Sequence, residues 1–554
     1  MSNSGWQEIA TKKQAERDAL LPSKWRLDMS KYQSRNNLLT VPIDCGILSD
    51  KQIDITSNYD AVDLIARMRD GTFSVEEVVT AFCARAAIAQ QLTNCLTEIF
   101  FDEAIERARQ LDHEKATNPD KPLPKLFGLP ISLKDSFMVP GTDATIGFIC
   151  FANDKSTKYS VLCEMLLEQG AVFYCKTAIP QTLMTADSDN NVFGRCLNPH
   201  NTSLTAGGSS GGEGALIAMR GSVVGIGTDI AGSIRIPAHC NGTYGFKPSA
   251  RVVSLQGKRS PGRAGLVGVE PVAGPLATSA RANALIMQVI LEAELWKRDS
   301  MLNHIFWRGL TLPNRPLKIG VVEDDGQNTP TPPMRRMMRD VSQKLMNAGV
   351  ELIPLKLTEV DKAMDLLWFS FSMDGMKVSP LSLCIVYDIH PSQDTVDYIN
   401  QSGEPMVNSV RQTGLVALPA KSIHEILDFT VARIGTQEKY RDMWLSNGLD
   451  ALIMPPAPFT APKIDTWGGL AAYTALWNLM DYPAAIVPIG QVNPDDRVDE
   501  AAKYGAKDAK VYNRYSGPEQ FADAPTTIQV VGMKQEDEYL ALVVEKLDAI
   551  LKSR

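Results

Sequence analysis

The sequence lacks several features that would define other classes of protein. It contains no uncharged apolar run of about 18 residues, so we expect no helix that spans a bilayer. The N-terminal segment carries a charge every few residues and lacks the apolar core of a secretory signal peptide. The formal net charge of -8 offers no broad positive field, and we therefore expect no nucleic-acid partner.

Cysteine is present in an odd number and without any C-x-x-C pair. This pattern disfavours a disulfide scaffold and a zinc site, and it indicates reduced thiols in a cytoplasmic compartment. The nine cysteines are widely scattered, at positions 45, 83, 95, 150, 163, 175, 196, 240 and 384.

The rest of the composition is that of a globular protein, with 44% hydrophobic and 22% charged residues in 554. Residues 1–57 mix charge with little periodicity, and we interpret them as an N-terminal helix followed by an extended arm. From residue 58 the pattern is helical, and after the apolar run at 128–135 strands alternate with helical stretches, which is typical of an α/β protein with a covered sheet. We find no repeat and no long linker, so residues 58–554 are predicted to form a single large domain.

Capping residues and apolar runs predict where some of these helices and strands lie. We expect Asn58 to cap a helix that ends at Gly71, and Ser74 with Glu77 to form a capping box for the next helix. The apolar run at 128–135, GLPISLKD, is typical of a buried strand, and further strands are expected at 172–177, 223–229 and 317–325. A strand and its packing helix close the chain.

The most unusual composition lies between residues 205 and 237, where five glycines surround the adjacent Ser209 and Ser210. Glycine allows a backbone to approach a ligand closely but adds entropy that folding must remove, so this density favours a functional loop. The stretch matches neither the P-loop, which needs a following Lys, nor the dinucleotide pattern G-x-G-x-x-G. We therefore do not expect a nucleotide site.

Two kinds of serine chemistry fit this loop. Residues 208–212 match the nucleophile elbow G-x-S-x-G, with Ser210 as nucleophile, which would need a later acid and histidine. Only His390 and His424 of the six histidines fall late enough. The other kind uses a desolvated lysine as base, and Lys134 at the end of the strand 128–135 is the candidate. A lysine that merely pairs with Asp135 remains the alternative at this point.

Three segments together are similar to the amidase signature family, whose members hydrolyse carboxamides with a Ser-cisSer-Lys triad. They are GLPISLKD (128–135), GGSSGGEGALIA (207–218) and GTDIAGSIRIPA (227–238), with family-like intervals of 75 residues from Lys134 to Ser209 and 24 from Ser209 to Ser233. The resemblance extends over about 60–554, and the N-terminal residues resemble the leader of fungal acetamidases and general amidases. It implies an α/β fold with a large mixed central sheet covered by helices on both faces.

The resemblance also implies roles for single residues. Ser233 would be the nucleophile, Ser209 would relay the proton after a cis peptide bond, Lys134 would be the base, and Ser210 would support them. Backbone N–H groups of the turn 230–233 would bind the oxyanion. The residues expected to bind substrate are Leu183, Ser209, Ile230, Ala231, Gly232 and Ser233. We interpret Asp229 and Arg235 as a buried pair that holds this turn.

The sequence departs from the commoner family pattern at Ala231, where many relatives have Gly, and at Cys196. A methyl group at 231 is expected to narrow the floor of the pocket without removing an N–H. Further apolar side chains that could line the same cavity are Met184, Trp368, Trp467 and Trp477.

The function implied is that of an amidase, a serine hydrolase that acts on linear amides and releases ammonia or an amine. The resemblance implies no cofactor and no metal, and the expected partner is a small-molecule amide. Two alternatives are a fatty-acid amide hydrolase with a longer acyl channel and a glutamine amidotransferase subunit. A homodimer is compatible with the resemblance, but the sequence does not define the oligomeric state.

Overall fold

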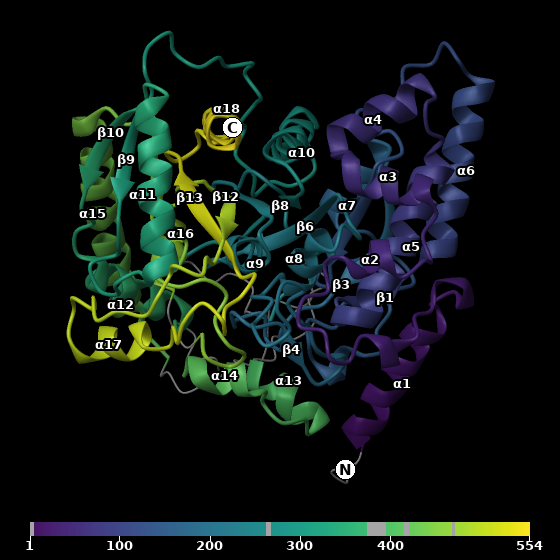
Figure 1. Ribbon diagram of the computed structural model, residues 1–554, viewed down its shortest axis with the longest axis horizontal. Coiled ribbons are helices and arrows are strands. Elements are labelled where there is room, and N and C mark those ends of the chain that lie inside the picture. Colours follow the sequence, from purple (N-terminus) through teal and green to yellow (C-terminus); the bar gives the residue numbers. More distant parts are fainter. Residues whose placement is uncertain (1–4, 262–267, 374–394, 415–419, 468–470, 554) are drawn as a thin grey trace.

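A mixed β-sheet of eleven strands runs through the molecule, in the order β1-β3-β2-β6-β8-β7-β12-β13-β11-β9-β10 (Figure 1). The computed structural model describes residues 5–261, 268–373, 395–414, 420–467 and 471–553. The strands of this sheet are β1 (Leu96–Ile99), β2 (Pro130–Lys134), β3 (Val172–Thr177), β6 (Val224–Asp229), β7 (Tyr244–Lys247), β8 (Val272–Ala277), β9 (Lys318–Val322), β10 (Glu351–Leu355), β11 (Ala451–Met454), β12 (Ala484–Gln491) and β13 (Pro525–Val531). A separate pair is formed by β4 (Asp189–Asn190) and β5 (Gly194–Arg195).

Helices occupy much of the remaining chain. They are α1 (Gly5–Ala19), α2 (Val41–Asp44), α3 (Asp50–Asn58), α4 (Ala61–Asp70), α5 (Val75–Thr93), α6 (Phe101–Thr117), α7 (Val161–Glu168), α8 (Gly211–Ala218), α9 (Arg235–Asn241), α10 (Ala280–Glu292), α11 (Pro332–Asn347), α12 (Val360–Phe371), α13 (Thr395–Ser402), α14 (Asn408–Thr413), α15 (Ile423–Asn447), α16 (Ala472–Leu479), α17 (Ala506–Tyr512) and α18 (Asp537–Lys552). Short 3-10 helices lie at Ser23–Trp25, Met29–Lys31, Ile149–Phe151 and Leu295–Lys297.

The middle of the sheet has helices on both faces. Figure 1 shows α10 and α18 on one side of β6, β8 and β12, and α8 and α9 on the other. The helix α8 lies very close to the chain after β3, because a Cβ at Gly212 would come within 2.2 Å of Ala178 N. This arrangement confirms the expected α/β fold with a large mixed sheet.

The parallel pairing of β2 with both β3 and β6 positions Lys134 beside the turn that follows β6. Ser132 lies opposite Gly225 and Leu133 opposite Ile226, so the carboxyl end of β2 lies beside that of β6. All five residues of β2 and all six of β6 are buried, as their continuous apolar runs predict. Lys134 therefore ends its strand next to the turn that follows Asp229.

Most local expectations are confirmed. Ser74 and Glu77 form the predicted capping box of α5, and Gly71 ends α4 in the left-handed conformation. The cap predicted for α4 is wrong, because Asn58 is the last residue of α3 and Asp60 caps α4 through the N–H groups of residues 62 and 63. An aspartate two residues further along forms the same type of cap.

The N-terminal region is more helical than expected. After α1, the predicted extended arm contains two 3-10 helices, α2 and α3. The helix α1 itself is held by buried charges, since Lys13 Nζ lies 3.1 Å from Glu98 Oε1 and 2.8 Å from Asp143 Oδ2. Arg17 Nη1 also donates to the Leu96 carbonyl oxygen at 3.1 Å. The first helix is thus bonded to β1 and to the loop that follows β2.

Two further features concern the described residues as a set. None of the helices within the described ranges is long and apolar enough to cross a membrane. The eight cysteines found in those ranges are free thiols.

Candidate active site

Lys134 lies at the centre of a buried polar cluster. Its side chain is fully buried, and Nζ lies 2.8 Å from Ser209 Oγ and 2.8 Å from Thr228 Oγ1. Ser209 follows a cis peptide bond from Gly208, as the resemblance implied. The structure therefore brings together Lys134 and Ser209, which are 75 residues apart in the chain.

The environment of Lys134 favours its neutral form. Burial, together with the nearby charge of Lys258, holds the pKa of Lys134 well below its usual value. The alternative pairing with Asp135 is not observed, because that carboxylate accepts hydrogen bonds from Thr97 Oγ1, Thr145 Oγ1 and the Ile146 N–H. A neutral amine has a lone pair that can accept a proton, so Lys134 has the properties of a base.

Ser210 has a different environment from Ser209. It is the N-cap residue of α8, its N–H donates to the Ser233 carbonyl oxygen at 3.2 Å, and its Oγ lies 3.5 Å from backbone atoms of Thr228. His424 lies exposed on α15, and His390 lies outside the described residues. Among the described residues, Ser210 therefore has no histidine partner of the kind that the nucleophile-elbow interpretation requires.

The turn after β6 is organised around the buried carboxylate of Asp229. Its two oxygens accept hydrogen bonds from the Gly232 N–H at 2.8 Å and the Ile234 N–H at 3.1 Å. Arg235 adds two more, from Nη2 at 2.9 Å and Nε at 3.0 Å. Burial alone would raise the pKa of Asp229, but the guanidinium of Arg235 more than offsets this and lowers it. This geometry confirms the buried pair predicted to hold the turn.

The same bonds correct one expectation about the oxyanion site. The Gly232 N–H is occupied by Asp229, so it does not point freely toward the cavity as expected. Gly232 is needed for another reason, since its φ is +130° and a Cβ there would come within 2.4 Å of Thr474 Oγ1. The N–H groups of Ile230, Ala231 and Ser233 remain as candidate donors.

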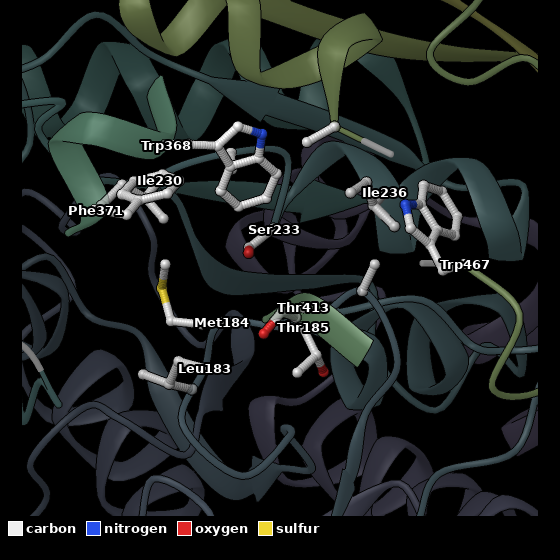
Figure 2. Close-up of a pocket in the computed structure, with 13 residues that line it drawn as sticks. Leu183, Met184, Thr185, Ile230, Ser233, Ile236, Trp368, Phe371, Thr413 and Trp467 are labelled. Carbon is white, nitrogen blue, oxygen red and sulfur yellow. The ribbon is translucent and has the colours of Figure 1, made fainter. Parts of the chain in front are cut away.

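Ser233 opens onto a cavity that is bounded by apolar side chains (Figure 2). The cavity contains about 530 Å³ of empty space, including the part that is open to solvent. Its lining consists of Leu183, Met184, Thr185, Ala186, Ile230, Ala231, Ser233, Ile236, Trp368, Phe371, Thr413, Trp467 and Ala471. None of these lining residues is charged.

We call Lys134, Ser209 and the turn 230–233 the floor, and the side chains of Leu183, Met184, Trp368, Phe371, Thr413 and Trp467 the wall. Figure 2 shows Ser233 between Trp368 and Ile230 on one side and Met184 and Leu183 on the other. Among the described residues, no hydrogen bond joins Ser233 Oγ to Ser209. Hydrogen bonds of a catalytic relay are often unformed before substrate binds.

The cavity contains most of the side chains predicted from the sequence, but not all. Leu183, Met184, Trp368 and Trp467 line it as expected. The expectation for Trp477 is wrong, because this side chain is fully buried and donates its indole N–H to Met454 Sδ at 3.2 Å. The lining residues that the sequence did not predict are Thr185, Ala186, Ile236, Phe371, Thr413 and Ala471. Ile236 lies within the motif 227–238 but was not singled out, whereas Phe371 and Thr413 come from helices distant in sequence that no motif marks.

Within the described ranges, no group of three or more His, Cys, Asp or Glu side chains is arranged to hold a metal ion. Besides the paired Asp229 and Arg235, the polar groups described around the turn 230–233 include hydroxyls, the Lys134 amine and backbone N–H groups. This set suits proton transfer and anion stabilisation at a serine.

Comparisons with known proteins agree with these features. A sequence model of the amidase family matches residues 77–541. A putative amidase of Schizosaccharomyces pombe is 35% identical over 99% of this chain and 99% of its own length. An acetamidase of Aspergillus oryzae is 33% identical, with full coverage of both chains.

Solved structures show the same fold. A fatty acid amide hydrolase superposes with a TM-score of 0.91 at 28% identity, covering 99% of this chain and 95% of that one. A bacterial aryl acylamidase of the amidase signature enzymes has a TM-score of 0.67 at 20% identity, covering 90% of this chain and 99% of that one. The second likeness concerns the fold alone.

Proposed function

The chain belongs to the amidase signature family of amide-hydrolysing enzymes, and we propose that it cleaves uncharged amides with an apolar acyl group through an acyl-enzyme on Ser233. The observation that carries this proposal is the buried contact of 2.8 Å between Lys134 Nζ and Ser209 Oγ beside Ser233 and an uncharged cavity. The wider family activity follows from the membership. The substrate class and the roles of single residues are our inference.

In the first step, Ser233 Oγ attacks the amide carbonyl carbon and a C–O bond forms. The proton of Ser233 passes to Ser209 Oγ, and the proton of Ser209 passes to the neutral amine of Lys134. For this, Ser233 rotates until its hydroxyl donates to Ser209. Thr228 supports the step because its Oγ1 accepts one N–H of the amine, which directs the nitrogen lone pair toward Ser209.

In the second step, the C–N bond breaks and the electron pair of the oxyanion reforms the carbonyl. Lys134, now an ammonium, returns its proton through Ser209 to the departing nitrogen, so that ammonia or a neutral amine leaves. Water then attacks the ester, and the same relay takes the proton of the water and gives one back to Ser233 Oγ. The enzyme is restored and a carboxylic acid is released.

Negative charge on the carbonyl oxygen would be held by N–H groups of the turn 230–233. Asp229 supports this role indirectly, because by bonding Gly232 and Ile234 it fixes the orientation of the peptide groups between them. Preorganised donors of this kind typically contribute about 3 to 4 kcal/mol each to lowering the barrier.

The lining of the cavity supports the proposed substrate class. Burying a charged group beside apolar side chains without a partner is costly, so an uncharged acyl group is favoured. Glutamine carries an ammonium and a carboxylate that none of the described lining residues would neutralise, which favours an uncharged amide over glutamine. Small and medium alkyl or aryl amides match this mostly apolar lining.

A fatty acid amide is the second candidate substrate. The TM-score of 0.91 to a fatty acid amide hydrolase supports it, and so does the apolar wall. The reaction would be the same, and only the length of the acyl group would differ. The cytoplasmic compartment and the homodimer stay predictions from the sequence.

The test measures release of ammonia or amine from acetamide, hexanamide, benzamide, an N-acylethanolamine and glutamine, with the Ser233→Ala variant as blank. We expect turnover of the uncharged amides that is absent in the blank. A fluorophosphonate should label Ser233 in the unmodified protein. Labelling of Ser210 that persists in Ser233→Ala, or glutamine as the preferred substrate, would refute the proposal.

A further inference from the structure

A turn in the wall of the cavity has an unusual backbone. Thr182 and Leu183 are consecutive non-glycine residues with positive φ, at 75° and 61°. Such residues persist only where the surroundings hold them, and they concentrate at ligand clamps. Leu183 lines the cavity, so this turn places a wall side chain.

One side of the turn rests on a neighbouring loop. A Cβ at Gly147 would lie 2.6 Å from both Gln181 Cα and the Pro180 carbonyl oxygen, which means that the two backbones are in direct contact. Gly147 has a φ of +78°, and the preceding residue Ile146 also has a positive φ, at 42°. The turn therefore cannot move toward this loop.

The other side of the turn is held by a segment more than 200 residues later, which we call the strap and which consists of residues 395–414 with α13 and α14. The Gln181 side chain is fully buried, and its Nε2 donates to Glu404 Oε2 at 2.8 Å and to the Pro405 carbonyl oxygen at 3.2 Å. Its Oε1 accepts the Val407 N–H at 3.0 Å. One amide thus makes three bonds to the strap.

The carboxyl group of Glu404 is surrounded by hydrogen-bond partners. Besides Gln181, it accepts the Ile149 N–H at 2.8 Å and Asn191 Nδ2 at 2.8 Å, and Ser402 Oγ lies 3.1 Å from Oε1. Burial raises its pKa, while these hydrogen bonds act in the opposite direction. The side chain is 4% exposed.

Apolar contacts join the same two parts. Leu183 and Ile399 of the strap belong to one buried cluster together with Ile146, Phe148 and Ile179. The last residue of α14, Thr413, lines the cavity. The wall side chains of the turn and of the strap are therefore connected through Gln181 and Glu404.

We propose that the Gln181–Glu404 pair is a positioning element that sets acyl-chain selectivity by holding the turn 180–184 and the strap as one rigid part of the wall. The pair touches neither Ser233 nor Lys134, so it acts on the acyl group through Leu183 and Thr413. Acetamide has one methyl group beyond its carbonyl and depends on the floor, whereas hexanamide extends along the wall. This inference rests on the proposed function.

The test compares kcat/KM for hexanamide with that for acetamide in the Gln181→Met and Glu404→Gln variants. In Gln181→Met, the methionine cannot make the three hydrogen bonds of the Gln181 amide to the strap. In Glu404→Gln, the new NH2 group would face the N–H donors that Glu404 accepts from. We expect the hexanamide-to-acetamide ratio to fall about tenfold, through KM, because pocket contacts of methylene size discriminate by about 10-fold or more. Glu425→Gln, at an exposed capping residue of α15, is the matched control and should leave the ratio unchanged.

The ratio does not depend on the concentration of folded enzyme, so partial misfolding of a variant does not obscure the result. The double variant should lose no more than either single variant if the pair acts as a unit. Equal losses on both amides, or an unchanged ratio in an active enzyme, would overturn this inference alone. If the unmodified protein neither hydrolyses an amide nor labels at Ser233, the proposed function fails and the inference fails with it.

Discussion

The floor and the wall of the cavity are held in place by different means. The floor lies at the ends of two adjacent parallel strands, β2 and β6, and its polar groups are bonded to each other and to a buried carboxylate. The wall comes from α12, α14, the turn 180–184 and Trp467, and all of its side chains except that of Thr413 are apolar. From this difference we expect the reaction to depend mainly on the floor and the selectivity mainly on the wall.

The largest effect is expected at the floor. The Lys134→Met variant removes the base but fills the same buried space with an apolar side chain, so the fold should be retained. We expect kcat/KM to fall by about 10³-fold or more for every amide alike, since loss of a relay member leaves only the residual rate of the remaining site. Ammonia release measures this, with thermal unfolding as the check on folding.

A Lys134→Met enzyme with intact turnover would refute the role of Lys134. If kcat/KM fell only for long amides, Lys134 would affect selectivity rather than the reaction, and the distinction between floor and wall would be wrong.

The next largest effect is expected at Asp229, which holds the turn 230–233 of the floor in place. In the Asp229→Asn variant, an amide NH2 faces Arg235 and the N–H groups of the turn, which leaves a buried guanidinium without its counter-charge. We expect the free energy of unfolding to fall by about 3 to 5 kcal/mol, measured by chemical denaturation. Glu16→Gln, which removes an exposed partner of Lys12, is the control and should cause no measurable change.

The pH profile sharpens the assignment of the base. The neutral amine is the active form, so kcat/KM should rise tenfold per pH unit until the pKa of Lys134 is passed and then level off. Because burial lowers this pKa, the plateau should begin well below about pH 10.4, where an exposed lysine loses its proton. An activity that still rises up to that pH would show that Lys134 is cationic in the resting enzyme.

The smallest effect is expected at the wall. The Leu183→Ala variant enlarges the cavity on the acyl side, and we expect it to change the preference between hexanamide and benzamide by a few-fold to tenfold. Acetamide should be hydrolysed at nearly the original rate. A loss for acetamide as large as for hexanamide would mean that Leu183 also supports the floor.

The floor could be predicted from the sequence because its residues lie in three contiguous motifs that resemble those of a known family. The residues alone indicated a buried strand ending at Lys134 and a functional glycine-rich loop, and the resemblance supplied the roles of Ser209 and Ser233. Asp229 and Arg235 were predicted as a pair for the same reason. The binding of Asp229 to the Gly232 N–H was missed, since hydrogen bonding within a turn depends on its dihedral angles.

The wall could be predicted only in part. Phe371 ends α12 and Thr413 ends α14, both far along the chain from the motifs, and nothing local marks a helix residue as a cavity residue rather than a core residue. Trp477 was misassigned for that reason. The bonds between Gln181 and Glu404 span 223 positions and have no local signal in the sequence.

The docking of α1 has a practical consequence for anyone who shortens the chain. A protein begun at residue 20 would leave Glu98 and Asp143 without the ammonium of Lys13, and both carboxylates are largely shielded from water. Asp143 belongs to the loop leading away from Lys134, and its backbone carbonyl is bonded by the buried Lys176. Removing α1 to improve crystals or yield would therefore disturb β1 and the loop that follows β2, although none of the described residues 5–19 lines the cavity.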